Sequence, residues 1–117
     1  MKLSEIKKIL DAKIITCENQ KNKELISAGG ADLMDDVLVS TAKDSVLLTG
    51  QIKIEVIEVC NMAEVGAIVF VRGKKPEQKM IDSANTYNIP ILLTDYSMFV
   101  SCGRLYMNGL RGFDGSW

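Results

Sequence analysis

The second half of the chain repeats one pattern, in which a short apolar run is followed by a polar turn and an amphipathic helix. The apolar runs lie at residues 45–48, 67–71 and 89–93, and helical spacing follows them at 53–64, 77–87 and 97–107. Val46, Ile68 and Ile91 occupy matching places about 22 residues apart, which suits right-handed crossovers between parallel strands. Runs this apolar are typical of strands covered on both faces. The pattern therefore predicts a mainly parallel sheet with helices on both sides.

The first part of the chain carries weaker signals of the same kind. Apolar residues at three- and four-residue spacing predict a helix over 3–10, capped by Ser4, and a strand is expected at 13–17. Asp32 is placed to cap a further helix, with Pro76 expected in the first turn of a later one. The inward residues expected for the helix after Asp32 are Leu33, Met34, Val37 and Leu38.

These elements predict a single α/β domain of three layers over residues 1–110. Residues 111–117 form a glycine-rich tail without helical spacing, which we expect to be flexible or docked on a partner. The expected core of the central strands consists of Val46, Leu48, Ile68, Phe70, Ile91 and Leu93.

Composition narrows the class of protein. The 117 residues are 47% hydrophobic and 25% charged, which fits one globular domain and is too apolar for intrinsic disorder. No run approaches a membrane span, and the charged start lacks the apolar centre of a signal peptide, so a soluble cytoplasmic protein is expected. The net charge of -1 lacks the basic surplus of a nucleic-acid binder. We expect neither nucleic acid nor membrane as a partner.

The absence of histidine limits the chemistry further. It removes the commonest general base near neutral pH and the usual partner of a nucleophilic serine or cysteine. Cys17, Cys60 and Cys102 form no CxxC pair, so they are read as free thiols, and neither a cofactor nor a metal is expected. Asp32, Asp35 and Asp36 could be metal ligands, but the spacing of Asp32 and Asp35 favours a helix cap and its third-position acid. We therefore predict no catalytic residues.

The turns after the strands are the candidate ligand site. In a parallel sheet the carboxyl ends of the strands share one edge, where backbone N–H groups and helix N-termini suit an anion. Arg72, Lys74 and Lys75 make this edge locally basic. A purely structural role for the same turns is the alternative. The candidate ligand-binding residues are Gly29, Gly30, Asp32, Thr49, Gly50, Arg72, Gly73, Lys74, Thr94 and Asp95.

Four segments resemble the stand-alone DRTGG-domain proteins. They are residues 28–38, 47–50, 67–76 and 90–99, of which the Asp-Leu-Met-x-Asp-Val-Leu and Val-Arg-Gly-Lys-Lys-Pro runs are the most specific. The resemblance implies a domain similar to those in some phosphate acetyltransferases and CBS-domain pyrophosphatases, and more distantly to the N-terminal domain of HPr kinase. In those settings the domain is accessory, and no catalytic residues carry over. The name-giving Asp-Arg-Thr-Gly-Gly string is absent, and Gln51-Ile52 stands where relatives often have Asp-Arg.

The leading hypothesis is a non-enzymatic regulatory or assembly module that senses a small anionic ligand, phosphorylated or nucleotide. A ligand-free interaction adaptor and an enzyme acting on a phosphorylated metabolite are the alternatives. A partner enzyme is a further candidate for interaction. We also expect a homodimer, because the apolar residues of the helices at 53–64 and 97–107 and of the tail exceed what one core needs. This apolar surplus comprises Ile54, Val56, Ile57, Cys60, Ala63, Met98, Phe99, Leu105, Tyr106, Met107, Phe113 and Trp117.

Overall fold

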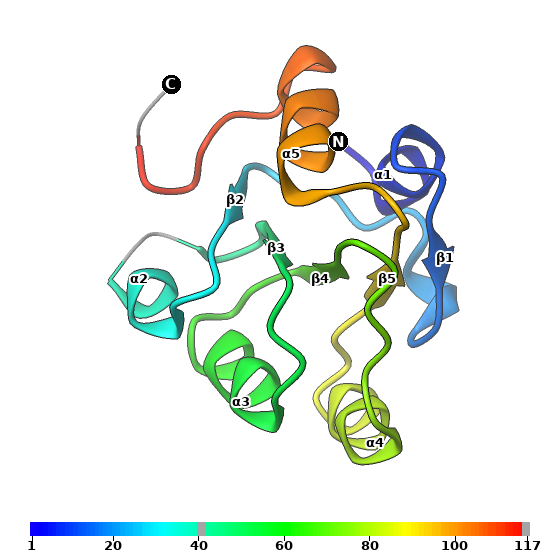
Figure 1. Cartoon of the computed structure of the whole chain (residues 1–117), viewed down its shortest axis with the longest axis vertical. Coiled ribbons are helices and arrows are strands. Elements are labelled where there is room, and N and C mark those ends of the chain that lie inside the picture. Colours follow the sequence, from blue (N-terminus) through cyan, green and yellow to red (C-terminus); the bar gives the residue numbers. More distant parts are fainter. Residues whose placement is uncertain (40–41, 116–117) are drawn as a thin grey trace.

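The computed structural model describes residues 1–39 and 42–115, in which helices and strands alternate as the pattern predicts (Figure 1). In chain order the elements are α1 (Leu3–Ile9), β1 (Lys13–Ile14), the 3-10 helix η1 (Glu18–Gln20), β2 (Ala28–Gly30), α2 (Met34–Leu38), β3 (Val46–Thr49), α3 (Ile54–Met62), β4 (Ala67–Phe70), α4 (Gln78–Thr86), β5 (Ile91–Leu93) and α5 (Met98–Met107).

The strands form one five-stranded sheet in the order β1-β5-β4-β3-β2. The pairs β2–β3, β3–β4 and β4–β5 are parallel, whereas β1 runs antiparallel to β5 with Lys13 opposite Leu93. The prediction of a mainly parallel sheet is confirmed. Because β1 is antiparallel, its first residue lies at the edge where the parallel strands end.

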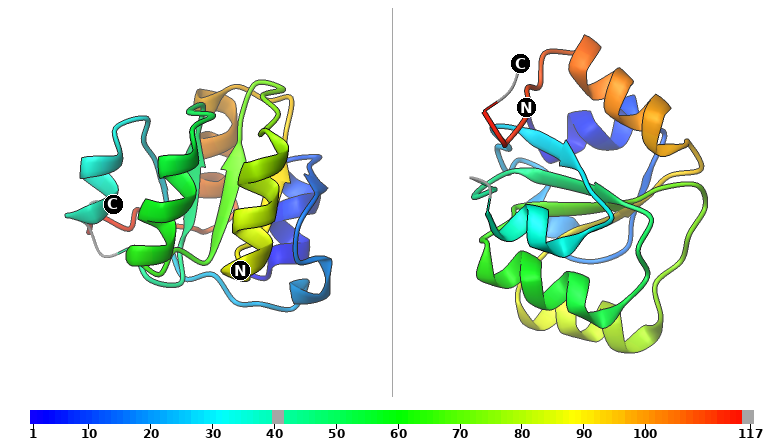
Figure 2. Two further views of the ribbon diagram at one scale, coloured as in Figure 1. Left: turned by 90° about the horizontal axis from the view of Figure 1, so that it is seen from below. Right: turned by 60° about the vertical axis from the view of Figure 1, so that its left-hand side comes forward.

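The sheet is the middle of three layers, as predicted. Helices α1 and α5 cover one face and α2, α3 and α4 cover the other (Figures 1 and 2). Each face has its own apolar cluster, and alternate strand residues supply them: Leu47 faces the side of α3, while Leu48 faces the side of α1 and α5. The predicted core residues are buried, except Leu93, which is half-buried because it ends β5 beside the edge strand.

Two predictions about helix starts and one about inward-facing residues are wrong. Ser4 does not cap α1, because the cap is Lys2, whose backbone N–H donates to the Glu5 carboxylate at 2.9 Å. Pro76 lies before the first turn of α4, whose cap is Glu77. Leu33 and Leu38 do not point inward and are 68% and 46% exposed. Helix α2 has only five residues, so a single turn can bury no more than Met34 and Val37.

Part of the glycine-rich tail lies along the outer edge of β2. Ala28 donates to the Arg111 carbonyl and accepts from the Phe113 N–H, each at 2.9 Å, which makes a parallel bridge between Ala28 and Gly112. The Phe113 ring is buried in the cluster below the sheet. Residues 111–113 are therefore docked on the chain's own sheet, in contrast to the flexible or partner-bound tail expected from the sequence. Trp117 lies outside the described residues, and the domain boundary at residue 110 stays a prediction.

Candidate functional site

The carboxyl ends of the parallel strands meet at one edge, and buried threonines end two of them. Thr49 ends β3 and its hydroxyl oxygen accepts from the Gln51 N–H at 3.1 Å, while Thr94 follows β5 and accepts from the Tyr96 N–H at 3.2 Å. Each hydroxyl also donates to another element: Thr49 to the Asp32 carboxylate at 3.2 Å and Thr94 to the Leu10 carbonyl at 2.7 Å. Both side chains are thus engaged within the chain and act as structural ties between elements.

Asp32 does not cap α2, contrary to the sequence prediction. The cap residue is Leu33, and the Asp32 carboxylate instead accepts from the Gly50 N–H at 2.9 Å and from the Thr49 hydroxyl. The Gly50 N–H lies just beyond the end of β3, where it needs an acceptor to replace the lost sheet partner. Asp32 therefore joins the connection after β2 to the turn after β3. Its carboxylate already occupies the place where an external anion would meet Gly50.

Arg72 approaches the same turn from β4. Its Nη2 atom lies 3.8 Å from the position that a Cβ on Gly50 would take, and Asp32 Oδ1 lies 3.7 Å from that position. The Arg72 backbone has φ of 57° and its N–H donates to the Tyr96 carbonyl at 2.8 Å. A left-handed conformation at a residue other than glycine is uncommon and costs free energy. Asp32, Thr49, Gly50 and Arg72 thus form one group, the Gly50 turn cluster.

Three further predicted residues, Gly73, Lys74 and Asp95, line an open hollow of about 440 Å³, here called the edge hollow. Gly73 has φ of 69° and donates to the Thr94 carbonyl at 2.9 Å, while its missing Cβ would stand 3.2 Å from Asp95 Oδ1. Lys74, Lys75 and Asp95 line the hollow, and Asp11, Ala12, Lys13 and Leu93 complete it. Lys13 is absent from the residues predicted for this site. The antiparallel direction of β1 brings it there, and no local sequence pattern encodes that direction.

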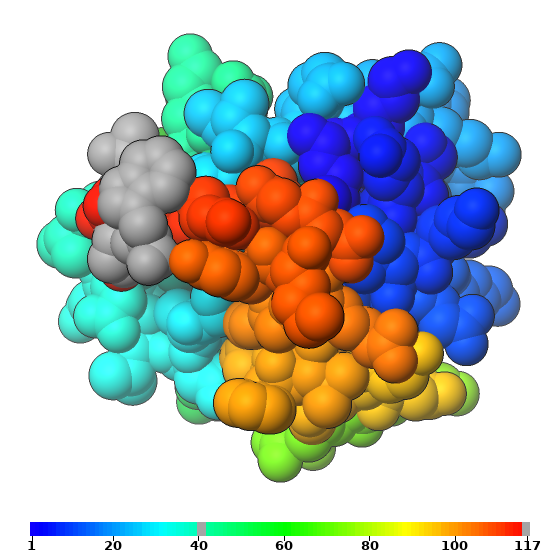
Figure 3. All heavy atoms as spheres, turned by 90° about the horizontal axis from the view of Figure 1, so that it is seen from above, coloured from blue at the N-terminus to red at the C-terminus, as the bar shows by residue number. Residues whose placement is uncertain are grey.

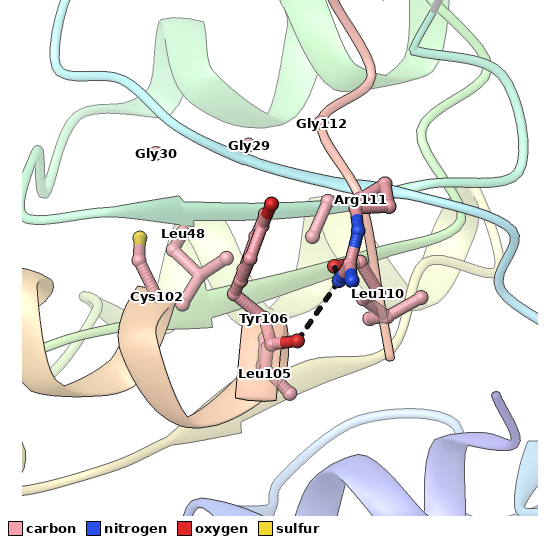
Figure 4. A pocket seen from close by; sticks show the side chains of 10 residues that line it. Gly29, Gly30, Leu48, Cys102, Leu105, Tyr106, Leu110, Arg111 and Gly112 are labelled. Carbon is pink, nitrogen blue, oxygen red and sulfur yellow. Dashed lines mark hydrogen bonds between the residues drawn. The ribbon is translucent and has the colours of Figure 1, made fainter. Parts of the chain in front are cut away.

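Gly29 and Gly30 serve packing. A Cβ on Gly29 would lie 2.6 Å from Phe113 Cε2, and one on Gly30 would lie 2.8 Å from Met98 Sδ. Both glycines line a largely apolar hollow of about 140 Å³ between β2, α5 and the tail. Figure 4 shows Tyr106 beside this hollow, with Arg111 donating to the Tyr106 carbonyl at 2.9 Å. The two glycines are therefore required by close approach of side chains on opposite faces of β2.

The cysteines do not supply an activated thiol. Burial raises the pKa of the Cys60 thiol to about 12, and burial also raises the pKa of Cys17 and of Cys102. A thiol is nucleophilic as the thiolate, so raised pKa values make these cysteines poor nucleophiles near neutral pH. Within residues 1–39 and 42–115, no three Cys, Asp or Glu side chains gather so that they could hold a metal ion. In the same part of the chain, no helix has the length and apolar character needed to cross a bilayer.

The apolar surplus expected on two helices occurs on one of them. In α3 the residues Val56, Ile57 and Cys60 are fully buried against the sheet, so this helix presents no broad apolar surface. On α5 the situation differs: Phe99 and Met107 are each 87% exposed. Val100 and Tyr106 are also exposed, and these four residues define the α5 face. Figure 3 shows α5 lying across the surface beside α1, and the exposed fractions of the four residues show that this face meets solvent.

The fold and the sequence of this chain are similar to those of known regulatory domains. A crystal structure of the CBS and DRTGG domains from the regulatory region of a Clostridium perfringens pyrophosphatase, complexed with its activator diadenosine tetraphosphate, matches with a TM-score of 0.74 and 17% sequence identity. The match covers 89% of this chain but 45% of that one, so this chain spans less than half of the related structure. No curated protein matches the sequence. The family model of the DRTGG domain matches residues 5–106, and the chain therefore belongs to the DRTGG domain family.

Proposed function

We propose that this chain is a non-enzymatic regulatory module that binds a small phosphorylated or nucleotide ligand in the edge hollow. The observation that carries the proposal is the gathering of Lys13, Lys74 and Lys75 around one hollow at the carboxyl edge of the sheet. Two of these lysines come from the turn after β4 and one from the antiparallel edge strand, so the fold brings the three charges together. Asp11 and Asp95 line the same hollow and partly offset them.

The Gly50 turn cluster supports the ligand site without holding the ligand. Its backbone donor is already used by Asp32, and the Arg72 guanidinium and the Asp32 carboxylate both lie within 4 Å of the Cβ position of Gly50. The Arg72 N–H and the Gly73 N–H fix the turn after β4 against Tyr96 and Thr94. The cluster thus sets the position from which Lys74 and Lys75 reach the hollow.

The comparisons agree with this proposal at the level of the family. The related pyrophosphatase structure contains a DRTGG domain in a regulatory region that was crystallised with a nucleotide activator. By analogy, the ligand of this chain is a nucleotide or another phosphorylated compound, and the regulated target is a partner enzyme. Ligand binding would change the conformation of the turn after β4, and the partner enzyme would bind differently to the two conformations.

Thermal unfolding of the chain with ADP, acetyl phosphate and coenzyme A tests the proposal. A ligand present at about 100 times its dissociation constant stabilises the folded state by about 2.7 kcal/mol, which raises the midpoint temperature measurably. The double variant Lys74→Gln with Lys75→Gln should lose this shift and keep its unfolding midpoint without ligand, because both side chains are exposed.

Arg72→Ala is the comparison variant within the same turn, at the residue that approaches the Gly50 turn cluster. We expect it to weaken the shift without removing it. If Arg72→Ala alone abolishes the shift while the lysine variant retains it, the ligand binds at the Gly50 turn cluster and the location proposed here is wrong. The absence of a shift with every compound would contradict ligand binding and favour the interaction adaptor.

The α5 face favours assembly as a second candidate function. Its four exposed apolar residues lie along one side of a surface helix, and Met and aromatic residues are typical of interface cores. We propose a homodimer formed through this face. A third candidate, an enzyme acting on a phosphorylated metabolite, would require an ionisable group with a shifted pKa in the edge hollow. The thiols whose pKa is raised do not line it.

A further inference from the structure

The basic residues of this acidic chain are unevenly distributed. A second hollow of about 460 Å³ lies beside α1 and is lined by Lys7, Lys8 and Lys21 together with Ser4. It shares Asp11 and Ala12 with the edge hollow, so the two hollows adjoin. Together they hold six of the 14 basic residues and two of the 15 acidic ones, a net charge of +4. The rest of the chain therefore carries -5.

In the described part of the chain, none of these six lysines forms an ion pair with a carboxylate. Within residues 1–39 and 42–115 the side-chain lysine ion pairs are Lys43 with Glu64 at 3.5 Å and Lys79 with Glu77 at 3.8 Å, neither of which belongs to the hollows. The lysines of the two hollows lie on α1, on β1, at the end of η1 and in the turn after β4. The tertiary fold therefore brings them together from separate parts of the sequence. Unneutralised charges of one sign at adjoining hollows raise the local concentration of an opposite ion.

We infer that the two hollows together bind a linear chain of three or more phosphate groups, with one end in the edge hollow and the remainder beside α1. The inference rests on the proposed function and narrows its ligand class. Lysine ammonium groups act as mobile point charges rather than as fixed forks, and they suit charge spread along a flexible chain. The lysines of the edge hollow differ from those beside α1, so contact with both sets favours a ligand with several linked phosphate groups. A polyphosphate chain, free or within a nucleotide, can engage both.

Asp11 provides an internal check because it lines both hollows. Its negative charge opposes a phosphate chain that passes over it. Asp11 has φ of 47°, a conformation that asparagine adopts readily, so Asp11→Asn should preserve the backbone. Removal of this charge should therefore tighten binding of a ligand that spans both hollows. It should affect a single phosphate less.

Isothermal titration of the full chain with sodium tripolyphosphate and with orthophosphate tests the inference. We expect tripolyphosphate to bind at least about tenfold more tightly than orthophosphate, with an affinity that falls as salt is added. The triple variant Lys7→Gln, Lys8→Gln and Lys21→Gln should remove this advantage and leave orthophosphate binding unchanged. Asp11→Asn should increase the affinity for tripolyphosphate about threefold or more, as expected for a like charge removed near the ligand.

A second triple variant, Lys43→Gln, Lys53→Gln and Lys79→Gln, changes the net charge equally at exposed lysines outside the hollows. It should alter tripolyphosphate affinity by less than about twofold, and unfolding midpoints confirm that each variant is folded. Equal losses in the two triple variants would show attraction to overall charge and overturn the inference. Equal binding of the two phosphates, abolished only by Lys74→Gln with Lys75→Gln, would overturn the extended site and leave the proposed function standing. Failure of both phosphates to bind would overturn the extended site, and the proposed function would also fall if ADP, acetyl phosphate and coenzyme A gave no thermal shift.

Discussion

At the scale of single residues, the carboxyl edge shows how polar side chains are divided between holding the fold and facing solvent. Thr49, Thr94 and Asp32 satisfy backbone groups that the sheet leaves unpaired, while Lys74 and Lys75 remain exposed. The sequence places all of these residues at strand ends, and it correctly predicts that the turns share one edge. It does not indicate that the Thr94 hydroxyl meets the Leu10 carbonyl, because that partner is 84 residues away and depends on how α1 packs.

The two glycines of β2 give a prediction with a matched control. Gly29→Ala should force the Phe113 ring from its position and destabilise the fold by about 1–3 kcal/mol, as overpacking does. Gly103→Ala should stabilise it by about 0.5–1 kcal/mol, because Gly103 lies in α5 with no atom within 4 Å of its Cβ position. Urea unfolding of the two variants measures both effects. Equal stability of the two variants would contradict the packing role of Gly29.

Cys60 gives a prediction about alkaline pH. Because burial raises the folded pKa of its thiol to about 12, the unfolded chain loses this proton at lower pH than the folded chain does. The free energy of unfolding is therefore unaffected by the ionisation of this thiol below its unfolded pKa near 9. It falls as pH rises from there toward 12, by up to about 1.4 kcal/mol per pH unit. Urea unfolding from pH 8 to 11 should show a smaller alkaline loss for Cys60→Ala than for the unchanged chain. Parallel pH profiles would contradict this assignment.

At the scale of elements, the strongest sequence signals correspond to the central strands and the helices that follow them. The apolar runs predict β3, β4 and β5, and the helix spacing predicts α3, α4 and α5, each to within a few residues at its ends. The early elements are less predictable for a physical reason. Strand β1 has two paired residues and α2 has five residues, so their form depends on packing against neighbours rather than on local periodicity.

The middle of the sheet provides the prediction for element packing. Ile68 in β4 is fully buried between strands and beneath α3, so Ile68→Ala should cost about 2–5 kcal/mol through lost burial and a residual cavity. Met62→Ala provides the comparison, because the Met62 side chain is 65% exposed at the end of α3. Its loss should be below about 0.5 kcal/mol. Chemical unfolding measures the stability of both variants. Similar losses in the free energy of unfolding would disprove the placement of Ile68 in the core.

At the scale of the whole molecule, the helices on each face divide the work of covering the sheet unequally. Helices α2, α3 and α4 cover the lower face, where Val56, Ile57 and Cys60 of α3 are buried. The upper face is covered by α1 and α5, and the α5 face points away from the core into solvent. The three-layer architecture follows from the sequence, because each apolar run requires cover on both sides. The sequence does not show which helix keeps exposed apolar residues, because helical periodicity alone does not show how a helix is rotated against its sheet.

The α5 face predicts the oligomeric state. Sedimentation at micromolar concentration should give a mass near twice 12.9 kDa for the unchanged chain. Phe99→Asp with Met107→Asp should give the monomer mass, since each substitution places a charge on the proposed interface. Met62→Asp, at an apolar position on α3 that is 65% exposed, should leave the dimer intact. A monomer mass for the unchanged chain would rule out the homodimer.

The docked tail has a consequence for how the protein behaves at high concentration. An outer strand with free backbone donors and acceptors is a template for strands of other molecules, and proteins resist fibre growth by covering it. Here residues 111–113 take up the outward N–H and carbonyl of Ala28, and β2 next to them contains two glycines that offer no charged side chain to repel a foreign strand.

The tail should therefore protect against self-association into fibres, independently of any ligand. A chain ended after Leu110 should bind thioflavin T and lose solubility on storage at concentrations where the complete chain stays clear. Phe113→Ala, which keeps the backbone contacts, should behave in between. If the shortened chain stayed as soluble as the complete one, the docked segment would have no such protective role, and the edge at β2 would be guarded by its shortness alone.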